Sequence, residues 1–545
     1  MNKIILMIIL NLSTLSFAQL NFQWHKTYGN LINGQGFYDD AYDIAMDDSG
    51  NVYITGDSFG IGDYSQHDFA TIKYNSLGET EWIRRYHHAS IDYSSIIKLD
   101  NKNNILVGGL SYDSSAGYSI VIIKYSSSGK TLWVKRYSDY VNIENEITSL
   151  TIDEKDNVYI TGYSFTYNTD GATTFILKFD PDGELFWQDI ITFGASLNPF
   201  MRANIDKKGN IYVTGIYRDS IVNHSEFLLI KYNNTGERVW LRSNLISTRN
   251  VGYDVQIDSK GNIYLGGIGT TKDFDYEFSI LKYDLNGNFL WSNSYPDYYP
   301  NFNQLTYPNM IILDSEDNVY ANFNYYSDSS IDIAVIKLNP MGNLIWNYTY
   351  DFNNSYENAT DFAIDENDNI YSIGISGLNT GNNSFVILKL NPDGMQKIIR
   401  NENQFNEAFK PNAISINNNG EIAATGSSPN QSAGWISDFC TIKYSSTIGI
   451  QSISESNPNS FNLSQNYPNP FNPITIINYK CSMFNDVVLK VFDVLGNEVA
   501  VLVNEKQNPG SYNVEFDGSN FSSGVYFYKL TAGEFSETKR MVLIK

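Results

Sequence analysis

Short runs of apolar residues, each bounded by Asp, Asn and Gly, recur along most of the chain. The stretch from Asp43 to Tyr86 shows the unit: DIAMDDSGNVYITG, then a loop, then DFATIKYNSLGETEWIRRY. It holds four runs rich in Val, Ile, Tyr and Phe, and such runs between turn signals predict β-strands. We name these expected strands A to D. The A–B and C–D turns are Asp/Asn/Gly clusters suited to tight reversals.

The unit occurs eight times at nearly constant spacing, which indicates a repeat fold. The residue that opens each A–B turn is Asp47, Asp100, Asp153, Asp206, Asp258, Asp314, Asp365 or Asn417. A Gly follows nine residues later, except at Phe323. Strand C always carries a Lys: Lys73, Lys124, Lys178, Lys231, Lys282, Lys337, Lys389 and Lys443. A turn Gly and then a Trp follow in most copies, with Ile398 at the Trp position of the seventh.

A unit of about fifty residues with four antiparallel strands is typical of a propeller blade. The eighth copy ends at Tyr444 without a strand D, whereas FQWHKTY (Phe22–Tyr28) repeats that strand near the start of the chain. An N-terminal strand that completes the last blade would remove the open edge. We therefore predict an all-β fold, with an eight-bladed β-propeller over residues 19–445 followed by a small β-sandwich domain. The strand C lysines, which repeat round the ring, are expected to pair with acidic or carbonyl groups.

The repeat resembles the bacterial β-propeller repeat (SBBP-type) family, whose unit reads roughly D-x-x-G-N-x-Y-x-T-G, then D-Y-x-T-x-K-Y and G-x-x-x-W. The resemblance covers about residues 20–445. It implies a propeller that is secreted or displayed at the cell surface, and it brings no catalytic residues. Eight copies instead of seven, Phe323 and Ile398 depart from the family pattern.

The pattern changes after residues 446–460, a polar stretch without the repeat that predicts a linker. Residues 461–545 contain alternating strands that predict a β-sandwich. They resemble the type A C-terminal sorting domain of type IX (Por) secretion substrates. The matching residues include Asn466, Pro468, Pro470, Phe471, Gly496, Gly524, Lys539 and Arg540. The resemblance implies the type IX secretion machinery as a partner and a protein secreted from, or attached to the outer surface (outer membrane) of, a Bacteroidetes-like bacterium.

Residues 1–18 have the pattern of a signal peptide: Lys3, an apolar run over residues 4–15, and Ser16-Phe17-Ala18. No later stretch reaches the length of a transmembrane helix, so none is expected in the mature chain. The formal net charge of −23 argues against nucleic acid as a partner.

The sequence predicts neither a metal site nor a cofactor. The five histidines show no zinc-ligand spacing. The A–B turns are similar to calcium loops, with Asp365–Asn369 as the best candidate, but the ladder of ligands is incomplete in every copy. Gly56–Gly60 fits G-x-S-x-G without the strand–turn–helix context that a nucleophile needs.

Loop lengths place the candidate binding surface. The Gly-to-Lys distance across the B–C loop varies from 14 to 17 residues, and the Trp-to-Asp distance across the D–A connection from 18 to 23. In an antiparallel blade both loops emerge on one face, where a rigid scaffold can carry variable functional loops. The expected ligand-binding residues are Tyr298, Tyr299, Tyr325, Tyr326, Trp435, Tyr112 and Tyr163.

We interpret the chain as a non-catalytic binding or adhesion module for a protein or polysaccharide. The alternative is a glycan-cleaving hydrolase or lyase that uses Asp and Glu on the same face. A structural envelope component is a third possibility.

Overall fold

The computed structural model describes residues 20–29, 31–32, 35–36, 38–59, 67–88, 91–113, 117–138, 144–165, 172–192, 200–218, 224–270, 276–297, 310–326, 330–352, 355–377, 384–394, 396–401, 409–430, 436–445, 461–482, 485–507, 510–518, 521–533 and 535–545. The expected signal peptide (1–18) and linker (446–460) lie outside these residues. The chain divides into two compact units, one formed by Phe22–Tyr444 and one that contains Ser445–Lys545.

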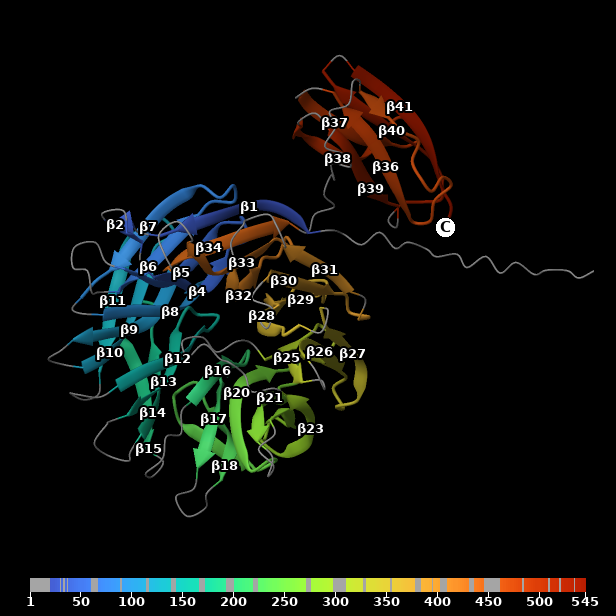
Figure 1. Cartoon of the computed structure of the whole chain (residues 1–545). Coiled ribbons are helices and arrows are strands. Elements are labelled where there is room, and N and C mark those ends of the chain that lie inside the picture. The colour runs from blue at the N-terminus through green and yellow to red at the C-terminus, as the bar shows by residue number, and fades with distance from the viewer. Residues whose placement is uncertain are drawn as a thin grey trace, which may run out of the picture. The chain divides into compact units, whose positions relative to one another are not determined.

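The first unit is a ring of eight antiparallel four-stranded sheets, or blades (Figure 1). Blade 1 consists of β4 (Asp39–Met46), β5 (Val52–Phe59), β6 (His67–Tyr74) and β7 (Thr80–Tyr86). Blade 2 consists of β8 (Ile91–Leu99), β9 (Ile105–Asp113), β10 (Gly117–Tyr125) and β11 (Thr131–Tyr137). Blade 3 consists of β12 (Glu144–Ile152), β13 (Val158–Phe165), β14 (Ala172–Phe179) and β15 (Leu185–Thr192). Blade 4 consists of β16 (Phe200–Ile205), β17 (Ile211–Arg218), β18 (Ser225–Tyr232) and β19 (Arg238–Asn244).

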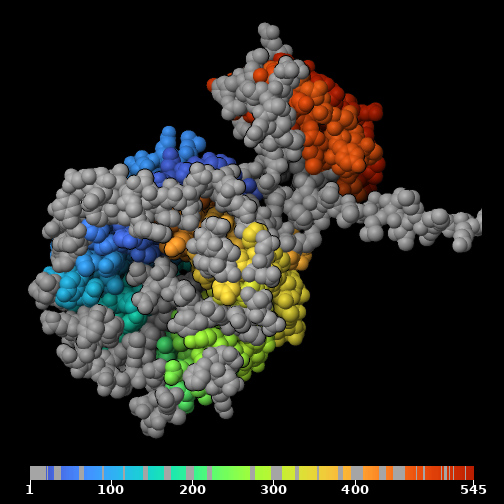
Figure 2. Space-filling model, viewed as in Figure 1, coloured from blue at the N-terminus to red at the C-terminus, as the bar shows by residue number. Residues whose placement is uncertain are grey.

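The remaining blades follow the same plan, and the described parts of successive blades follow one another round the disc in Figure 2. Blade 5 consists of β20 (Arg249–Ile257), β21 (Ile263–Thr270), β22 (Tyr276–Tyr283) and β23 (Phe289–Asp297). Blade 6 consists of β24 (Ile311–Leu313), β25 (Val319–Tyr326), β26 (Ile331–Leu338) and β27 (Leu344–Tyr350). Blade 7 consists of β28 (Asn358–Ile364), β29 (Ile370–Ser376), β30 (Ser384–Leu390) and β31 (Gln396–Asn401). Blade 8 consists of β32 (Lys410–Ile416), β33 (Ile422–Asn430), β34 (Ile436–Ser445) and β1 (Asn21–Tyr28). The short strands β2 (Leu31–Ile32) and β3 (Gln35–Gly36) pair with each other.

In every blade except the seventh, which has Ile398, the tryptophan of strand D packs against the turn Gly of the next blade. Trp82 Nε1 donates to the carbonyl oxygen of Ser127 in blade 2 at 3.1 Å. Its ring lies against Gly129, whose φ is 79° and where a Cβ would meet the indole at 2.8 Å. The same hydrogen bond joins Trp133 to Pro181, Trp291 to Pro340 and Trp346 to Pro392. Trp24 of β1 repeats it from blade 8 to blade 1, with Nε1 3.1 Å from the Ser76 oxygen. The predicted closure of the ring by the N-terminal strand is therefore confirmed.

The strand C lysines strengthen the same interfaces. Lys124 Nζ lies 2.9 Å from Asp100 Oδ2 in its own blade and donates to the Pro181 carbonyl of the next blade at 3.2 Å. Carbonyl oxygens of the next blade also accept from Lys73, Lys178, Lys231, Lys282, Lys337 and Lys443. Lys389 lies over the ring of Tyr371, 5.0 Å from its centroid. The predicted pairing is thus confirmed for every strand C lysine except Lys389.

The second unit is a small sandwich of two sheets. One sheet has the order β35 (Asn462–Leu463), β36 (Ile474–Cys481) and β39 (Gly510–Asp517). The other has the order β38 (Glu498–Gln507), β37 (Asn485–Phe492), β40 (Gly524–Ala532) and β41 (Phe535–Leu543). Ile477 and Phe516 of the first sheet and Leu489, Tyr528 and Met541 of the second share one buried core. Within the described residues, no helix has the length and apolar character needed to cross a membrane.

Candidate functional site: an axial cavity

The innermost strand carries a β-bulge at the same place in seven blades; the corresponding position of blade 6 lies outside the described residues. In β8 the pairing with β9 runs from Ser94–Gly109 directly to Ile96–Gly108, so Ser95 is the extra residue. The residues bulged in this way are Tyr42, Ser95, Thr148, Met201, Tyr253, Thr360 and Asn412. A bulge bends its strand and redirects side chains, and it is often found beside functional sites.

The repeated glycine of strand B makes room for this bulge. Gly109 lies opposite it, and a Cβ there would come within 2.0 Å of the Tyr93 carbonyl oxygen. Blade 6 has Phe323 at this position, and the residues of its inner strand that would lie opposite Phe323 are outside the described residues. Phe323 stacks instead on Phe278 of blade 5, with centroids 5.0 Å apart and ring planes 11° apart. In the seven blades whose bulge the structure describes, the glycine lies opposite it.

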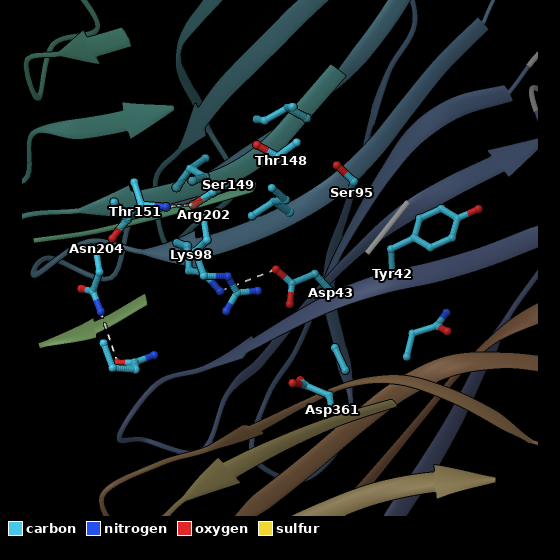
Figure 3. A pocket seen from close by; sticks show the side chains of 17 residues that line it. Tyr42, Asp43, Ser95, Lys98, Thr148, Ser149, Thr151, Arg202, Asn204 and Asp361 are labelled. Carbon is cyan, nitrogen blue, oxygen red and sulfur yellow. Dashed lines mark hydrogen bonds and ion pairs between the residues drawn. The ribbon is translucent and has the colours of Figure 1, made fainter. Parts of the chain in front are cut away.

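Side chains of the inner strands enclose a cavity of about 210 Å³ on the axis of the ring (Figure 3). Residues of blades 1 to 5, 7 and 8 contribute to its lining. The polar lining residues include Tyr42, Asp43, Ser95, Lys98, Thr148, Ser149, Thr151, Arg202, Asn204, Gln256, Asp361 and Asn412. The volume is below the roughly 300–1,000 Å³ of small-molecule pockets. A cavity of this size would hold one unit of a larger ligand.

Charges of both signs lie in or beside the cavity. Lys98 Nζ is 3.7 Å from Asp43 Oδ2, which also accepts from the backbone N–H of Ile97 at 2.9 Å. Arg202 Nη1 is 3.6 Å from Asp254 Oδ1. Burial, followed by the charge of Asp57, raises the pKa of Tyr42, so its phenol stays neutral. The lining therefore offers hydroxyl, amide, carboxylate and cationic groups to a polar ligand.

Sequence reasoning missed this cavity because it concentrated on loops. The signal was present in the bulged position and the position after it. The residues that follow the bulge are Asp43, Ile96, Ser149, Arg202, Asp254, Asp361 and Ala413. The residue types at these two positions differ from copy to copy, whereas the Asp, Lys and Trp positions at the blade interfaces repeat.

Only part of the expected aromatic surface lies in the described residues. Tyr298, Tyr299 and Trp435 lie outside them, as does the side chain of Tyr326. Tyr325 is 36% exposed. Tyr112, at the end of β9, packs against Tyr118 with ring centroids 4.8 Å apart. Tyr163 is buried, and its hydroxyl donates to the Glu146 carboxylate.

Two clusters of titratable side chains also escaped sequence reasoning, since their members come from different strands. Asp68, His87 and Asp92 form one, and Asp332, Asp351 and Glu357 form the other; within each, the ligand atoms lie within 4.8 Å. His87 Nδ1 is 2.9 Å from Asp68 Oδ1 and 3.9 Å from Asp92 Oδ2. Both clusters lie at corresponding positions between two blades, near the B–C and D–A loops.

Burial governs the acidic cluster between blades 6 and 7. Burial raises the pKa of Glu357 to about 7, although the hydroxyls of Ser355 and Ser376 hydrogen-bond to its carboxyl group. Burial also raises the pKa of Asp332, and the charge of Asp351 adds to this effect. Glu357 is completely buried, so it is not positioned to act on a bound substrate.

The turn that we considered for calcium uses its carboxylates internally. Asp365 Oδ1 accepts from the backbone N–H groups of Asn367 and Asn369, each at 2.9 Å. Asp368 accepts from the backbone and hydroxyl of Ser315 in blade 6, at 3.0 and 2.6 Å. The repeated turn acids thus act as acceptors for N–H and O–H groups that fix the turns and the blade contacts.

The sorting-signature residues are brought together in the second unit. Asn466 is buried, and its Nδ2 donates to Thr475 Oγ1 at 2.8 Å. Phe471 is in the core, and its carbonyl accepts from the Ile544 N–H at 2.9 Å. Gly496 has a φ of 82° in the β37–β38 turn. The other signature residues are Pro468, Pro470, Gly524, Lys539 and Arg540.

Comparisons with known proteins identify the second unit. Residues 465–545 match the family model described as the secretion system C-terminal sorting domain. No curated protein matches the chain. The fold and this match define the class: a β-propeller that carries a type IX secretion sorting domain. Such a domain directs a protein of Bacteroidetes to secretion or to attachment at the cell surface.

Solved structures give weak likenesses. PorZ, an essential bacterial surface component of the type IX secretion system of Porphyromonas gingivalis, is 10% identical with a TM-score of 0.28; the match covers 93% of this chain and 81% of PorZ. A puromycin hydrolase is 7% identical with a TM-score of 0.41, over 72% of this chain and 58% of the hydrolase. A protein of unknown function from Dyadobacter fermentans is 10% identical with a TM-score of 0.36, over 78% and 99%. TM-scores below 0.5 support no inference about this chain.

Proposed function

We propose that this protein is a non-catalytic binding module that works outside the cell and captures a polysaccharide through the axial cavity. The observation that carries the proposal is the contrast between two sets of positions. Contacts between blades repeat round the ring, as a structural role requires, whereas the residues at the axis differ from blade to blade. If the cavity binds a ligand, we expect the scaffold residues to repeat from blade to blade and the lining residues to vary.

The chemistry of the lining favours a ligand rich in hydroxyl groups. Ser95, Thr148 and Thr151 can donate and accept hydrogen bonds, and Asn204 and Gln256 offer amide groups. A sugar hydroxyl also donates and accepts, so it can replace water at such groups without leaving a buried donor or acceptor unpaired.

A protein ligand is the main competitor, and glycan cleavage is the second candidate. Cleavage is favoured by one observation, the raised pKa of Glu357 beside Asp332, because a carboxyl that is partly protonated near pH 7 can act as a general acid. The complete burial of Glu357 favours binding instead. We also infer that residues 1–18 are removed as a signal peptide and that residues 446–460 join the two units.

A cavity-filling variant of the mature chain tests the proposal on a glycan array. Thr151→Trp would occupy the cavity, while Thr131→Trp places the same side chain at an exposed position of β11. We expect wild type and T131W to capture the same glycans, and T151W to lose at least tenfold in affinity with an unchanged melting temperature. Undiminished capture by T151W would refute the axial site. Release of shortened glycans would support the hydrolase or lyase, and capture of proteins alone would exclude the polysaccharide.

A further inference from the structure

Four segments that are distant in sequence meet at one end of the sorting domain. The end of β37 pairs with the start of β40 (Phe492–Phe527), and the start of β40 pairs with the end of β41 (Gly524–Leu543). The Ile544 N–H donates to the Phe471 carbonyl at 2.9 Å, which brings the Asn466–Phe471 segment to the same place. We call this end, formed by residues 466–473, 493–497, 523–527 and 540–545, the signature end.

The most exposed large apolar side chains of the domain lie at the signature end. Among the described residues of the domain, four large apolar side chains are more than half exposed: Tyr467 (77%), Val494 (65%), Leu495 (83%) and Ile544 (52%). All four lie in the segments of the signature end. Exposed apolar residues that gather in one place mark interaction sites more often than scattered ones do.

Val494 and Leu495 are held outward by a rigid turn. The Asp493 carboxylate accepts from the backbone N–H groups of Leu495 at 2.8 Å and Asn497 at 2.9 Å. Asn497 Nδ2 donates to the second Asp493 oxygen at 2.9 Å, and Gly496 supplies the positive φ. Turn positions of this kind ordinarily hold polar residues. Val494 and Leu495, at the tip of this turn, contribute little to the stability of the fold and are available to a partner.

The sorting domain has almost no net charge. Residues 461–545 hold seven basic and eight acidic residues, a net charge of −1, against −23 for the chain. Long-range electrostatic attraction to a partner is therefore weak, which leaves shape and apolar contact as the main means of recognition. Apolar anchors at the centre of a contact surface contribute most of the affinity of many interfaces.

We propose that the signature end is the docking surface for a protein of the type IX secretion machinery, and that an apolar pocket of that protein receives Val494 and Leu495. The match of residues 465–545 to a secretion sorting domain identifies the partner system, and the exposed tip identifies the contact. The buried signature residues have a different role, because Asn466 and Phe471 build the end that carries the tip.

The test uses the full-length protein in a bacterium that has type IX secretion. We expect the double variant Val494→Ser/Leu495→Ser to fold, to accumulate in the periplasm and to fall at least tenfold at the cell surface and in the medium. Val501→Ser is the matched control, since Val501 is 48% exposed in β38 of the same domain but outside the signature end. Normal export of the double variant, or an equal loss with V501S, would overturn the proposal.

A second measurement keeps the proposal falsifiable if the double variant folds poorly. A photoreactive phenylalanine analogue at position 495 keeps the tip apolar and forms a covalent bond with whatever contacts it on irradiation. We expect an adduct that mass spectrometry identifies as a type IX secretion protein, and no such adduct from position 501. Adducts with lipid or with a second copy of this chain only would refute the proposed partner.

Discussion

At the residue scale, the repeated glycine of strand B shows how one side chain can control the axis of the ring. Gly109 has no side chain because the backbone of the neighbouring bulge occupies that space. The bulge in turn sets the side chains that line the cavity. In blade 6 Phe323 takes the place of this glycine and stacks on Phe278 of blade 5. The repeated glycine of strand B is thus linked to the candidate site by a steric constraint.

The glycine can be tested by adding a single methyl group. Gly109→Ala would place a Cβ within 2.0 Å of the Tyr93 oxygen, so the bulge must shift. We expect a loss of roughly 1–3 kcal/mol in the free energy of unfolding of the propeller, as for overpacking in general. Gly524→Ala is the control, because its nearest neighbour would be 3.9 Å away. Denaturant unfolding measures both, and a neutral G109A would show that the bulge is not tightly constrained.

Glu357 should make stability depend on pH. Its pKa is raised from 4.5 to about 7 in the folded protein, so the folded state holds the proton more tightly than the unfolded state. The contribution of Glu357 to the free energy of unfolding is therefore greatest below about pH 4.5. It declines by on the order of 3 kcal/mol as the pH rises to about 7.

Melting curves from pH 4 to 8 test this dependence on pH. Glu357→Gln keeps the shape and removes the titration, so its melting temperature should fall less than that of the wild type over this range. Glu366→Gln changes an exposed residue and should follow the wild type. Parallel curves for E357Q and the wild type would contradict the assigned pKa.

At the scale of elements, a Trp packed against a turn Gly, together with a Lys, holds each blade to the next at every junction except that of blades 7 and 8. The contact explains a coincidence in the sequence: the seventh copy has Ile398 at the Trp position, and the eighth has Ile448 at the turn Gly position. Because the Trp of one blade packs against the turn Gly of the next, both departures fall on the same pair of blades. Neither was interpretable from one copy alone.

The strand β1 provides the same contact across the point where the ring closes. Removing residues 19–28 should expose the edge of β34 and leave a gap beside Gly78, where the Trp24 ring now lies. Trp24→Ala alone should cost about 3–5 kcal/mol. We expect a lower melting temperature for W24A and aggregation of the truncated chain, measured by calorimetry and light scattering. His25→Ala, at an exposed neighbouring position, is the control, and an unchanged W24A would show that closure does not depend on the indole.

The positions of most strands could be predicted from the sequence, because turn residues and apolar runs mark each of them. The blade-to-blade role of Trp82 could not, because its partner Ser127 is 45 residues away. The Asp68, His87 and Asp92 cluster was hidden for the same reason. The axial cavity was hidden by the bulge, which shifts side chains by one residue and disturbs the alternation that sequence reading relies on.

At the scale of the whole molecule, the chain combines two units with separate cores. The propeller core consists of clusters between neighbouring blades, for example Tyr53, Phe69 and Val107 of blades 1 and 2. The sorting domain has its own cluster and shares none of these residues. Export information and ligand binding are therefore expected to be separable.

Deletion of residues 461–545 should leave a folded propeller that stays in the periplasm. The propeller closes its ring with β1 and β34, which both lie before residue 446, so the truncation removes no blade strand. Fractionation should find the truncated protein in the periplasm, and the purified protein should keep the melting temperature of the propeller and its capture of glycans. The T151W variant of the full chain should show the opposite pattern, with normal export and lost capture. Normal surface display of the truncated chain would show that the sorting domain is dispensable, whatever the outcome for the cavity.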